Sequence, residues 1–182
     1  MRDNLDEWNQ WSADNRSIET MRRLAEDMMR IEDDSDLYVY AAEHHLPANE
    51  LVYYLNAYEA GGDAGLEAIR NPDIIPPEVA RAAIKTIAGI LDAHFEHRLP
   101  YRLTDEGTAI GVYQIQERDD GDRYLFRICQ LRLTLATHQW HLYWLRKFGA
   151  WWPYSLPETG RRFTLRARMQ QVLEDWDGCF WG

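Results

Sequence analysis

Apolar residues recur every three or four positions in the first third of the chain, which predicts helices. Ser17 is a suitable N-cap for the first helix, which is predicted over residues 18–31. A second helix is predicted over residues 36–44, capped by its first residue, an aspartate. A third runs from residue 49 to Gly61-Gly62, where glycine can end a helix in the left-handed conformation. These three segments indicate a small helical bundle.

A proline-rich segment, NPDIIPPE at residues 71–78, interrupts the helical pattern because proline restricts both itself and the residue before it. The next apolar stripe predicts a long amphipathic helix over residues 77–97. We therefore expect an acidic helical module in residues 1–70, a linker in residues 71–77 and a second domain in residues 78–182.

After residue 100 the apolar period changes to two, which predicts β-strands. The predicted strands cover residues 109–117, 124–135, 140–146 and 151–154. Short turn-like segments separate them, so an antiparallel meander is expected. In the longest strand the apolar positions change parity near Cys129-Gln130, which predicts a β-bulge. A final helix is predicted over residues 163–176, and the fold class is α+β.

Composition is typical of a folded protein that works in the cytoplasm. Of 182 residues, 46% are hydrophobic, which is enough for a substantial core. The apolar runs fall short of the roughly 20 residues that cross a bilayer, and the first residues do not resemble a signal peptide. The two cysteines, Cys129 and Cys179, have no metal-like spacing, so we expect reduced thiols, no redox role and no membrane partner.

Charge is divided unevenly along the chain, although the net charge is -10. The acids are concentrated before residue 78, and the remainder is nearly balanced. No lysine or arginine occurs in residues 31–69, while acids are frequent there. A polyanion such as DNA would be repelled by this segment.

The second half of the chain resembles a bacterial family catalogued as domain of unknown function 3024. The matching features are a long helix ending near HRLP, the strand GVYQIQER, the segment HQWHLYWLRKFGAWWPY and the terminal DWDGCFWG. They extend over residues 77–182. The resemblance implies domain boundaries but assigns no activity to any residue.

The first half resembles the helix-turn-helix of insertion-element transposases and related regulators. Five residues match that module at its alanine, glycine and aliphatic positions: Ala41, His45, Leu46, Leu51 and Leu55. The glycine-rich segment at residues 61–66 is similar to the one that closes the module. His45 departs from the pattern because a turn glycine usually occupies its place, where φ is positive.

The third helix would be the recognition helix of such a module, and its DNA-contacting candidates are Ala48, Asn49, Tyr53 and Asn56. Because no nearby residue can neutralise a phosphate, we favour a structural or protein-contacting role for them. Asn49 is then the helix cap. The acids Glu32, Asp33 and Asp34 are additional candidates for contact with a basic protein partner.

Basic residues gather at the start of the last helix, where Arg161, Arg162, Arg166 and Arg168 could hold a nucleic-acid backbone. The alternative interpretation is a solvated helix face, because the second domain carries nearly as many acids as bases. Nucleic acid is thus a possible partner through this domain.

The sequence contains candidate residues for a metal site and for a nuclease site. His94 and His97 have a spacing that could direct two imidazoles toward a metal, with His138 or His141 as a third ligand. Asp105, Glu106 and Glu117 could form a metal-dependent nuclease site, but the lysine expected after the last acid is missing. Histidines at a polar helix end and acids in turns account for both patterns, so no metal, no cofactor and no catalytic residue is predicted.

These observations favour a non-enzymatic interaction or regulatory protein whose acidic module contacts a protein partner. The first alternative is a DNA-binding regulator of transcription or of a mobile element, with phosphate contacts from the later arginines. The second alternative is a metal-dependent hydrolase or nuclease. Trp8 and Trp11 could dock on this chain or on another copy, so a homo-oligomer is also possible.

Overall fold

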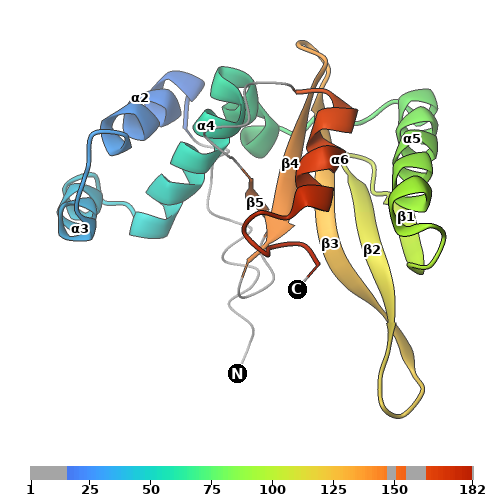
Figure 1. Cartoon of the computed structure of the whole chain (residues 1–182). Coiled ribbons are helices and arrows are strands. Elements are labelled where there is room, and N and C mark those ends of the chain that lie inside the picture. Colours follow the sequence, from blue (N-terminus) through green and yellow to red (C-terminus); the bar gives the residue numbers. More distant parts are fainter. Residues whose placement is uncertain (1–15, 147–150, 155–162, 182) are drawn as a thin grey trace.

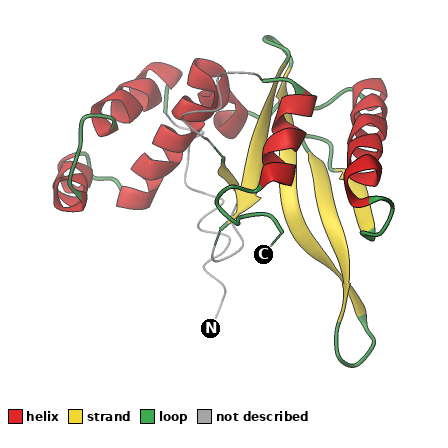
Figure 2. Cartoon of the chain, in the orientation of Figure 1, coloured by secondary structure: helices red, strands yellow, loops and turns green. Residues whose placement is uncertain are grey.

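The structure, a computed structural model, describes residues 16–146, 151–154 and 163–181. Helices and a single antiparallel sheet share the chain, as expected for the α+β class (Figures 1 and 2). The helices are α2 (Ile18–Met28), α3 (Asp34–Glu43), α4 (Ala48–Arg70), α5 (Pro77–Phe95) and α6 (Leu165–Glu174). The strands are β1 (Tyr101–Asp105), β2 (Ile110–Glu117), β3 (Arg123–Thr134), β4 (Gln139–Leu145) and β5 (Trp151–Pro153).

Helices α2 and α3 begin at side-chain caps. Ser17 caps α2 as predicted, because its side chain accepts a hydrogen bond from the backbone N–H of Thr20 at 3.2 Å. The predicted start of α3 at Asp36 is wrong, because the cap is Asp33. The extended backbone of Asp33 lets its carboxylate accept the N–H of Ser35 at 2.7 Å, so the helix starts two residues earlier.

Helix α4 differs from its prediction at both ends. Its N-cap is Pro47 and makes no side-chain bond, so Asn49 is an exposed first-turn residue and not the cap. The backbone leaves helical geometry at Gly61 and Gly62, where φ of Gly62 is 58°, and then resumes a helix as far as Arg70. The glycine pair therefore makes a kink within α4 where the sequence predicted an end.

The sheet has the predicted meander topology, with strand order β1-β2-β3-β4-β5. The edge strand β1 was not predicted, because YRLTD is short and mostly polar. The bulge was predicted correctly to within a residue: Val112 pairs with Cys129 and Tyr113 with Arg127, so Ile128 is the extra residue.

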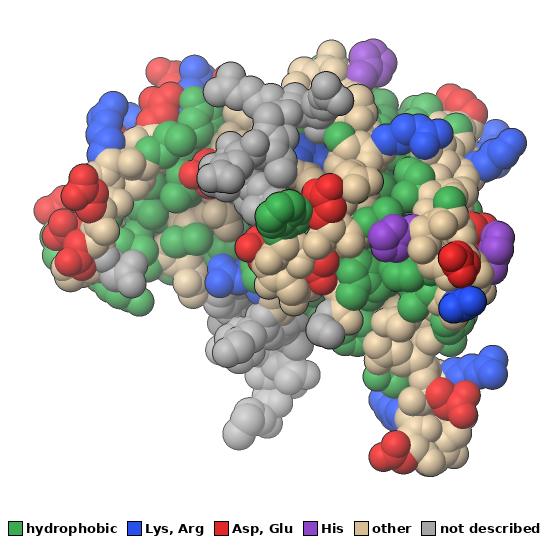
Figure 3. All heavy atoms as spheres, viewed as in Figure 1, with side chains coloured by type: hydrophobic (Ala, Val, Ile, Leu, Met, Phe, Trp, Pro, Cys, Tyr) green, Lys and Arg blue, Asp and Glu red, His purple; other side chains and the backbone are tan. Residues whose placement is uncertain are grey.

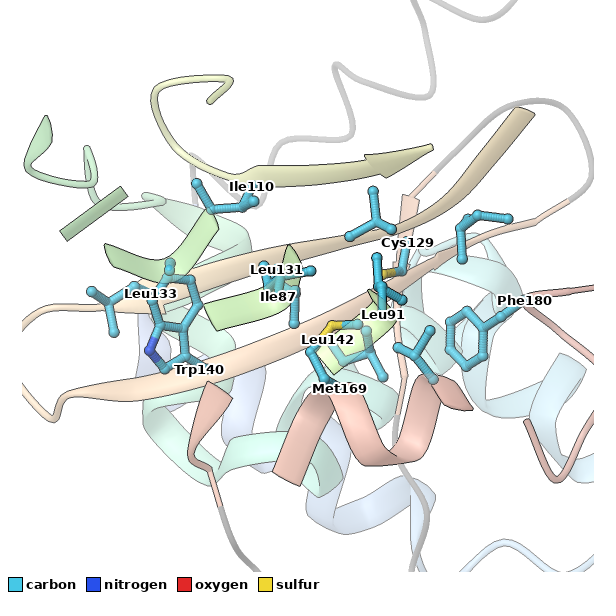
Figure 4. Packing of buried hydrophobic residues seen from close by; sticks show 14 of the residues in the cluster. Ile87, Leu91, Ile110, Cys129, Leu131, Leu133, Trp140, Leu142, Met169 and Phe180 are labelled. Atoms are coloured by element: carbon cyan, nitrogen blue, oxygen red, sulfur yellow. The ribbon is translucent and has the colours of Figure 1, made fainter. Parts of the chain in front are cut away.

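The two faces of the sheet carry different layers. Helices α5 and α6 cover one face, where Ile87, Leu91 and Met169 pack on apolar strand residues (Figure 4). The other face packs against α4, and Tyr143 of β4 belongs to the helical cluster around Leu51. The sheet is thus the middle layer between helices α2 to α4 on one side and helices α5 and α6 on the other (Figure 1).

The proline-rich segment before α5 is held against the sheet. The Asp73 carboxylate accepts the backbone N–H of Leu135 at 2.7 Å, and the N–H of buried Ile75 donates to the carbonyl of Gly107 at 2.8 Å. Both contacts join this segment to turns of the second domain. Helix α5 then starts at Pro77, as predicted.

The final helix ends two residues before its predicted end at residue 176. Helix α6 ends at Glu174, and Asp175 takes a left-handed conformation with φ of 39°. The chain turns there, so Trp176 is 74% exposed and does not join the apolar stripe of α6. Trp140 and Trp152 are buried, and Trp144 is half-buried against the core.

Neither cysteine is in a disulfide: Cys129 is buried in the sheet core and Cys179 is partly exposed. Among the described residues, no helix combines the length and the apolarity needed to span a bilayer.

Candidate functional site

Helix α4, the expected recognition helix, lies between α2 and strands β3 to β5. Of its side chains, those of Asn49, Glu59 and Asp63 are exposed, and two of these are acids. Asn56 is half-buried. A helix enclosed in this way has no broad face to insert into a DNA groove, so its packing disfavours DNA recognition through α4.

Tyr53 illustrates the enclosure of α4. Its ring lies edge-on to Trp152 of β5, with ring centroids 5.2 Å apart. Burial raises the pKa of the Tyr53 hydroxyl, and the nearby Arg132 guanidinium opposes this shift. This tyrosine therefore packs α4 onto the sheet, and it is not part of the exposed surface of the acidic module.

The turn between α3 and α4, residues 44–47, adopts the geometry expected for a tight helix-helix turn. His45 has a φ of 53°, the left-handed conformation that glycine usually supplies. Leu46 is buried beneath the turn.

The acidic candidates surround the start of α3. Glu32, Asp33 and Asp36 are exposed, and Asp34 is the first residue of the helix. The hydrogen bonds from Ser35 lower the pKa of the Asp33 carboxyl, so this cap stays ionised at neutral pH. In the space-filling view acids gather at this end of the molecule, beside apolar side chains (Figure 3).

Helix α3 is apolar on two sides. Leu37, Tyr40 and Ala41 face the helical core, and the Tyr40 hydroxyl donates to Asp27 of α2 at 2.9 Å. Burial and this carboxylate raise the pKa of Tyr40 to about 12.

The opposite side of α3 is an exposed apolar stripe that the sequence analysis missed. We define this α3 stripe as Tyr38, Val39 and Ala42, which share one helix face at i, i+1 and i+4. Tyr38 is 67% exposed and Val39 is 58% exposed. Their spacing can be read from the sequence. The core-facing residues Leu37, Tyr40 and Ala41 give a stronger apolar pattern in the same helix, so the second stripe was not recognised.

The arginine candidates fall into three groups. Arg161 and Arg162 lie outside the described residues. Arg166 is exposed on α6. Arg168 is buried, which corrects its assignment as a nucleic-acid contact.

Arg168 joins α6, the sheet and α4 through its guanidinium. It donates to the carbonyls of Trp140 at 2.9 Å and Ala60 at 3.1 Å, and to the side chain of Gln171 at 2.8 Å. Burial lowers the pKa of Arg168 to about 10, so it remains charged at neutral pH. A sequence pattern cannot distinguish this arginine from Arg166, because the two differ only in which way they face.

An open groove between α5 and α6 contains Arg166, and we call it the α5–α6 groove. Lys85 and His94 of α5 line it together with Arg166, over apolar side chains that include Ile90 and Leu173. Its volume is about 660 Å³. Thus two residues singled out in the sequence for different reasons, His94 and Arg166, line the same groove.

The four histidines proposed as metal ligands are not brought together. His94 lies in the α5–α6 groove, His97 contacts Asp92 at 3.5 Å, and His138 is in the β3–β4 turn. His141 is buried on the opposite face of the sheet from α5. In the described part of the chain, no group of three potential metal ligands occurs.

His141 instead belongs to a buried polar contact beside the α4 kink. The Thr134 hydroxyl donates to the carbonyl of Ala64 at 3.3 Å, so it accepts from Nε2–H of His141 at 2.9 Å. In the part of the chain that the structure describes, Nδ1 of His141 has no hydrogen-bond partner. Burial, together with Arg168 and Arg132, lowers the pKa of His141 to about 4.

Each acid proposed for a nuclease site interacts with a different partner. The Asp105 carboxylate accepts the N–H of Gly107 at 2.9 Å, and Glu106 accepts from Gln130 at 2.6 Å. Glu117 pairs with Arg123 at the turn between β2 and β3. This end of β2 lies about seven residues, or roughly 24 Å, from the start of the strand at Ile110. These acids do not converge on a common site.

One family model matches the chain, over residues 75–182, and its description is Domain of unknown function (DUF3024). No curated protein and no solved structure matches the chain. The match starts just before α5 and takes in α5, the whole sheet and α6. Because it spans more than half of the residues, the chain belongs to the DUF3024 family.

Proposed function

We propose that this is a non-enzymatic interaction protein whose helix α3 docks into an apolar, basic-edged groove of a protein partner. The α3 stripe is the observation that carries this proposal. An isolated exposed apolar residue is ordinary, but three on one face of a short helix form the pattern used when a helix binds a groove.

The charge around the α3 stripe supports a basic partner. Glu32, Asp36 and Glu43 are exposed, and none of them forms an ion pair within the described residues. No lysine or arginine of residues 31–69 offsets them. Such a surface attracts basic proteins and repels nucleic acids, which also sets partner choice and orientation.

The α3 stripe can supply useful binding energy without a change of fold. Fully burying one large apolar side chain contributes about 1.5 to 3 kcal/mol. Tyrosine is also common among residues that dominate binding, because it combines a large ring with a polar end. Tyr38 and Val39 would therefore act as the apolar anchors, and the surrounding acids would select the partner.

Affinity capture from the native host tests this proposal with matched variants. Tyr38→Ala/Val39→Ala removes the anchors, and Glu32→Lys/Glu43→Lys reverses two charges without touching the Asp33 cap. Ile74→Ala is the control, because Ile74 is 73% exposed but lies outside the module. We expect the wild type and the control to retain the same partner proteins and both α3 variants to lose them. Equal retention by all four proteins would contradict the proposal.

A further inference from the structure

The α5–α6 groove is a basic feature on the surface of this acidic protein. Helices α5 and α6 run in the same direction along its walls (Figure 1). Lys85, His94 and Arg166 stand around apolar residues Ile90 and Leu173. In Figure 3, apolar side chains between these helices are flanked by basic and histidine side chains. The groove thus combines an apolar floor with cationic edges.

Lys85 and Arg166 are the two strong bases of the groove. Within the described residues, neither Lys85 nor Arg166 forms an ion pair or a side-chain hydrogen bond. The described residues that line the groove include no acid. Both side chains are therefore free to pair with the carboxylates of a bound molecule.

Gly89 is a second feature that keeps the groove open. It lies in the interior of α5, where glycine costs about 1 kcal/mol relative to alanine. No neighbouring packing requires it, because a Cβ at Gly89 would meet no atom within 4 Å. The absence of a side chain leaves room at the middle of the groove.

Helix α3 has the properties that this groove would accept. The groove extends from Lys85 to His94, nine residues or about 14 Å along α5, and α3 has 10 residues, or about 15 Å. The α3 stripe is apolar and edged by acids, whereas the groove floor is apolar and edged by cations. The two surfaces are similar in length, both are apolar along the middle, and their edges carry opposite charges.

The match cannot be made within one molecule. Helix α3 lies at one end of the structure, while α5 and α6 lie toward the other end, beyond the sheet (Figure 1). The α3 stripe could reach the α5–α6 groove only from a second copy.

We propose that the α5–α6 groove is the docking site for helix α3 of a second copy of this chain. This inference rests on the proposed docking role of α3 and names the basic-edged groove that α3 enters. The contact joins two different surfaces, so it is head-to-tail. A pair of copies therefore keeps one free α3 and one free groove. The assembly then grows to a ring or a short filament. The net charge of -10 on each copy opposes association, so the contact is weak and concentration-dependent.

Sedimentation equilibrium of the full chain tests this proposal. At about 50 mM salt, we expect the average mass to rise above the monomer's 21.5 kDa as protein concentration approaches roughly 200 µM. Lys85→Glu/Arg166→Glu and Glu32→Lys/Glu43→Lys should each remain monomeric. An equimolar mixture of these two variants should associate again, because every junction between unlike copies regains opposite charges.

Two further variants separate the groove from general effects. Gly89→Leu places a side chain in the open groove, favours the helix and should prevent association. Arg102→Glu/Arg118→Glu changes the net charge as much as the groove variant does, at exposed positions on the sheet, and its effect on association should be much smaller.

A wild type that stays monomeric over this range would overturn the proposal. So would association that survives in the groove variants, or that is lost equally in the Arg102→Glu/Arg118→Glu control. If the groove variants still associate but the α3 variants do not, α3 docks elsewhere. The proposed function would then stand without this inference.

Discussion

At the residue scale, two arginines two positions apart in α6 have opposite roles. Arg168 is enclosed and makes three hydrogen bonds, two of them to other elements, whereas Arg166 is exposed in the α5–α6 groove. Sequence spacing placed both in one basic cluster. Their separation depends on the rotation of α6 over the sheet, which only the three-dimensional packing determines.

Replacing these two arginines gives the first prediction. Arg168→Met should lower the free energy of unfolding by about 2 to 4 kcal/mol, because two buried carbonyls and Gln171 lose their donor. Arg166→Met should change it by less than about 0.5 kcal/mol, since the side chain is exposed. Urea denaturation at pH 7 measures both. Similar losses for the two variants would show that Arg168 is not a structural link.

His141 makes stability depend on pH. Its pKa is about 4 in the folded protein and about 6.5 when unfolded, so the unfolded state binds a proton first as pH falls. Stability is therefore lost between about pH 6.5 and pH 4, and this residue should remove about 2 kcal/mol between pH 7 and pH 5. Urea denaturation at both pH values should show that difference in the wild type but not in His141→Gln. An equal loss in both proteins would contradict the assignment.

At the scale of the elements, two glycines within helices have different reasons to be there. Gly62 has a φ of 58° and forms the kink of α4, whereas Gly89 is part of a regular helix with open space around it. The kink brings Gly61 so close to His141 that a Cβ would lie 2.6 Å from the ring. The sequence indicated a break at the glycine pair, but the nearby ring belongs to a strand about 80 residues later and could not be predicted.

Alanine substitution should separate the two glycines. Gly62→Ala should destabilise the protein by about 1 kcal/mol, because alanine is strained at positive φ. Gly89→Ala should stabilise it by about 0.5 to 1 kcal/mol, since the helix gains propensity without a clash. Thermal unfolding of the two variants beside the wild type measures the opposite shifts. A loss of stability in Gly89→Ala would mean that this position has a packing role.

At the scale of the whole molecule, the local elements were more predictable than their arrangement. Periodicity identified α2, α5, strands β2 to β5 and the bulge, since each depends on neighbouring residues. It could not show that α4 would lie against the sheet. For this reason the sequence did not reveal that the DNA-contact candidates on α4 are enclosed by neighbouring elements. The acidic surface was predicted from charge, whereas the α3 stripe and the α5–α6 groove required the fold.

The contacts between the helical module and the sheet predict joint unfolding. Arg168 bonds to Ala60, Thr134 bonds to Ala64, and Tyr143 is buried in the helical cluster. Far-ultraviolet circular dichroism follows all the helices, while tryptophan fluorescence mainly follows the sheet domain. We expect the two signals to give the same urea midpoint. Separate midpoints would show that the module and the sheet domain unfold independently.

The central claim is that the exposed side of α3 meets another protein. A photo-crosslinking amino acid at position 38, compared with the same group at position 74, measures this most directly in the native host. Both positions are exposed, so unspecific adducts should be equal at the two sites. We predict that position 38 gives a discrete protein adduct, which Glu32→Lys/Glu43→Lys abolishes, while position 74 does not. The claim would be contradicted if position 38 gave no adduct, or if positions 38 and 74 crosslinked equally.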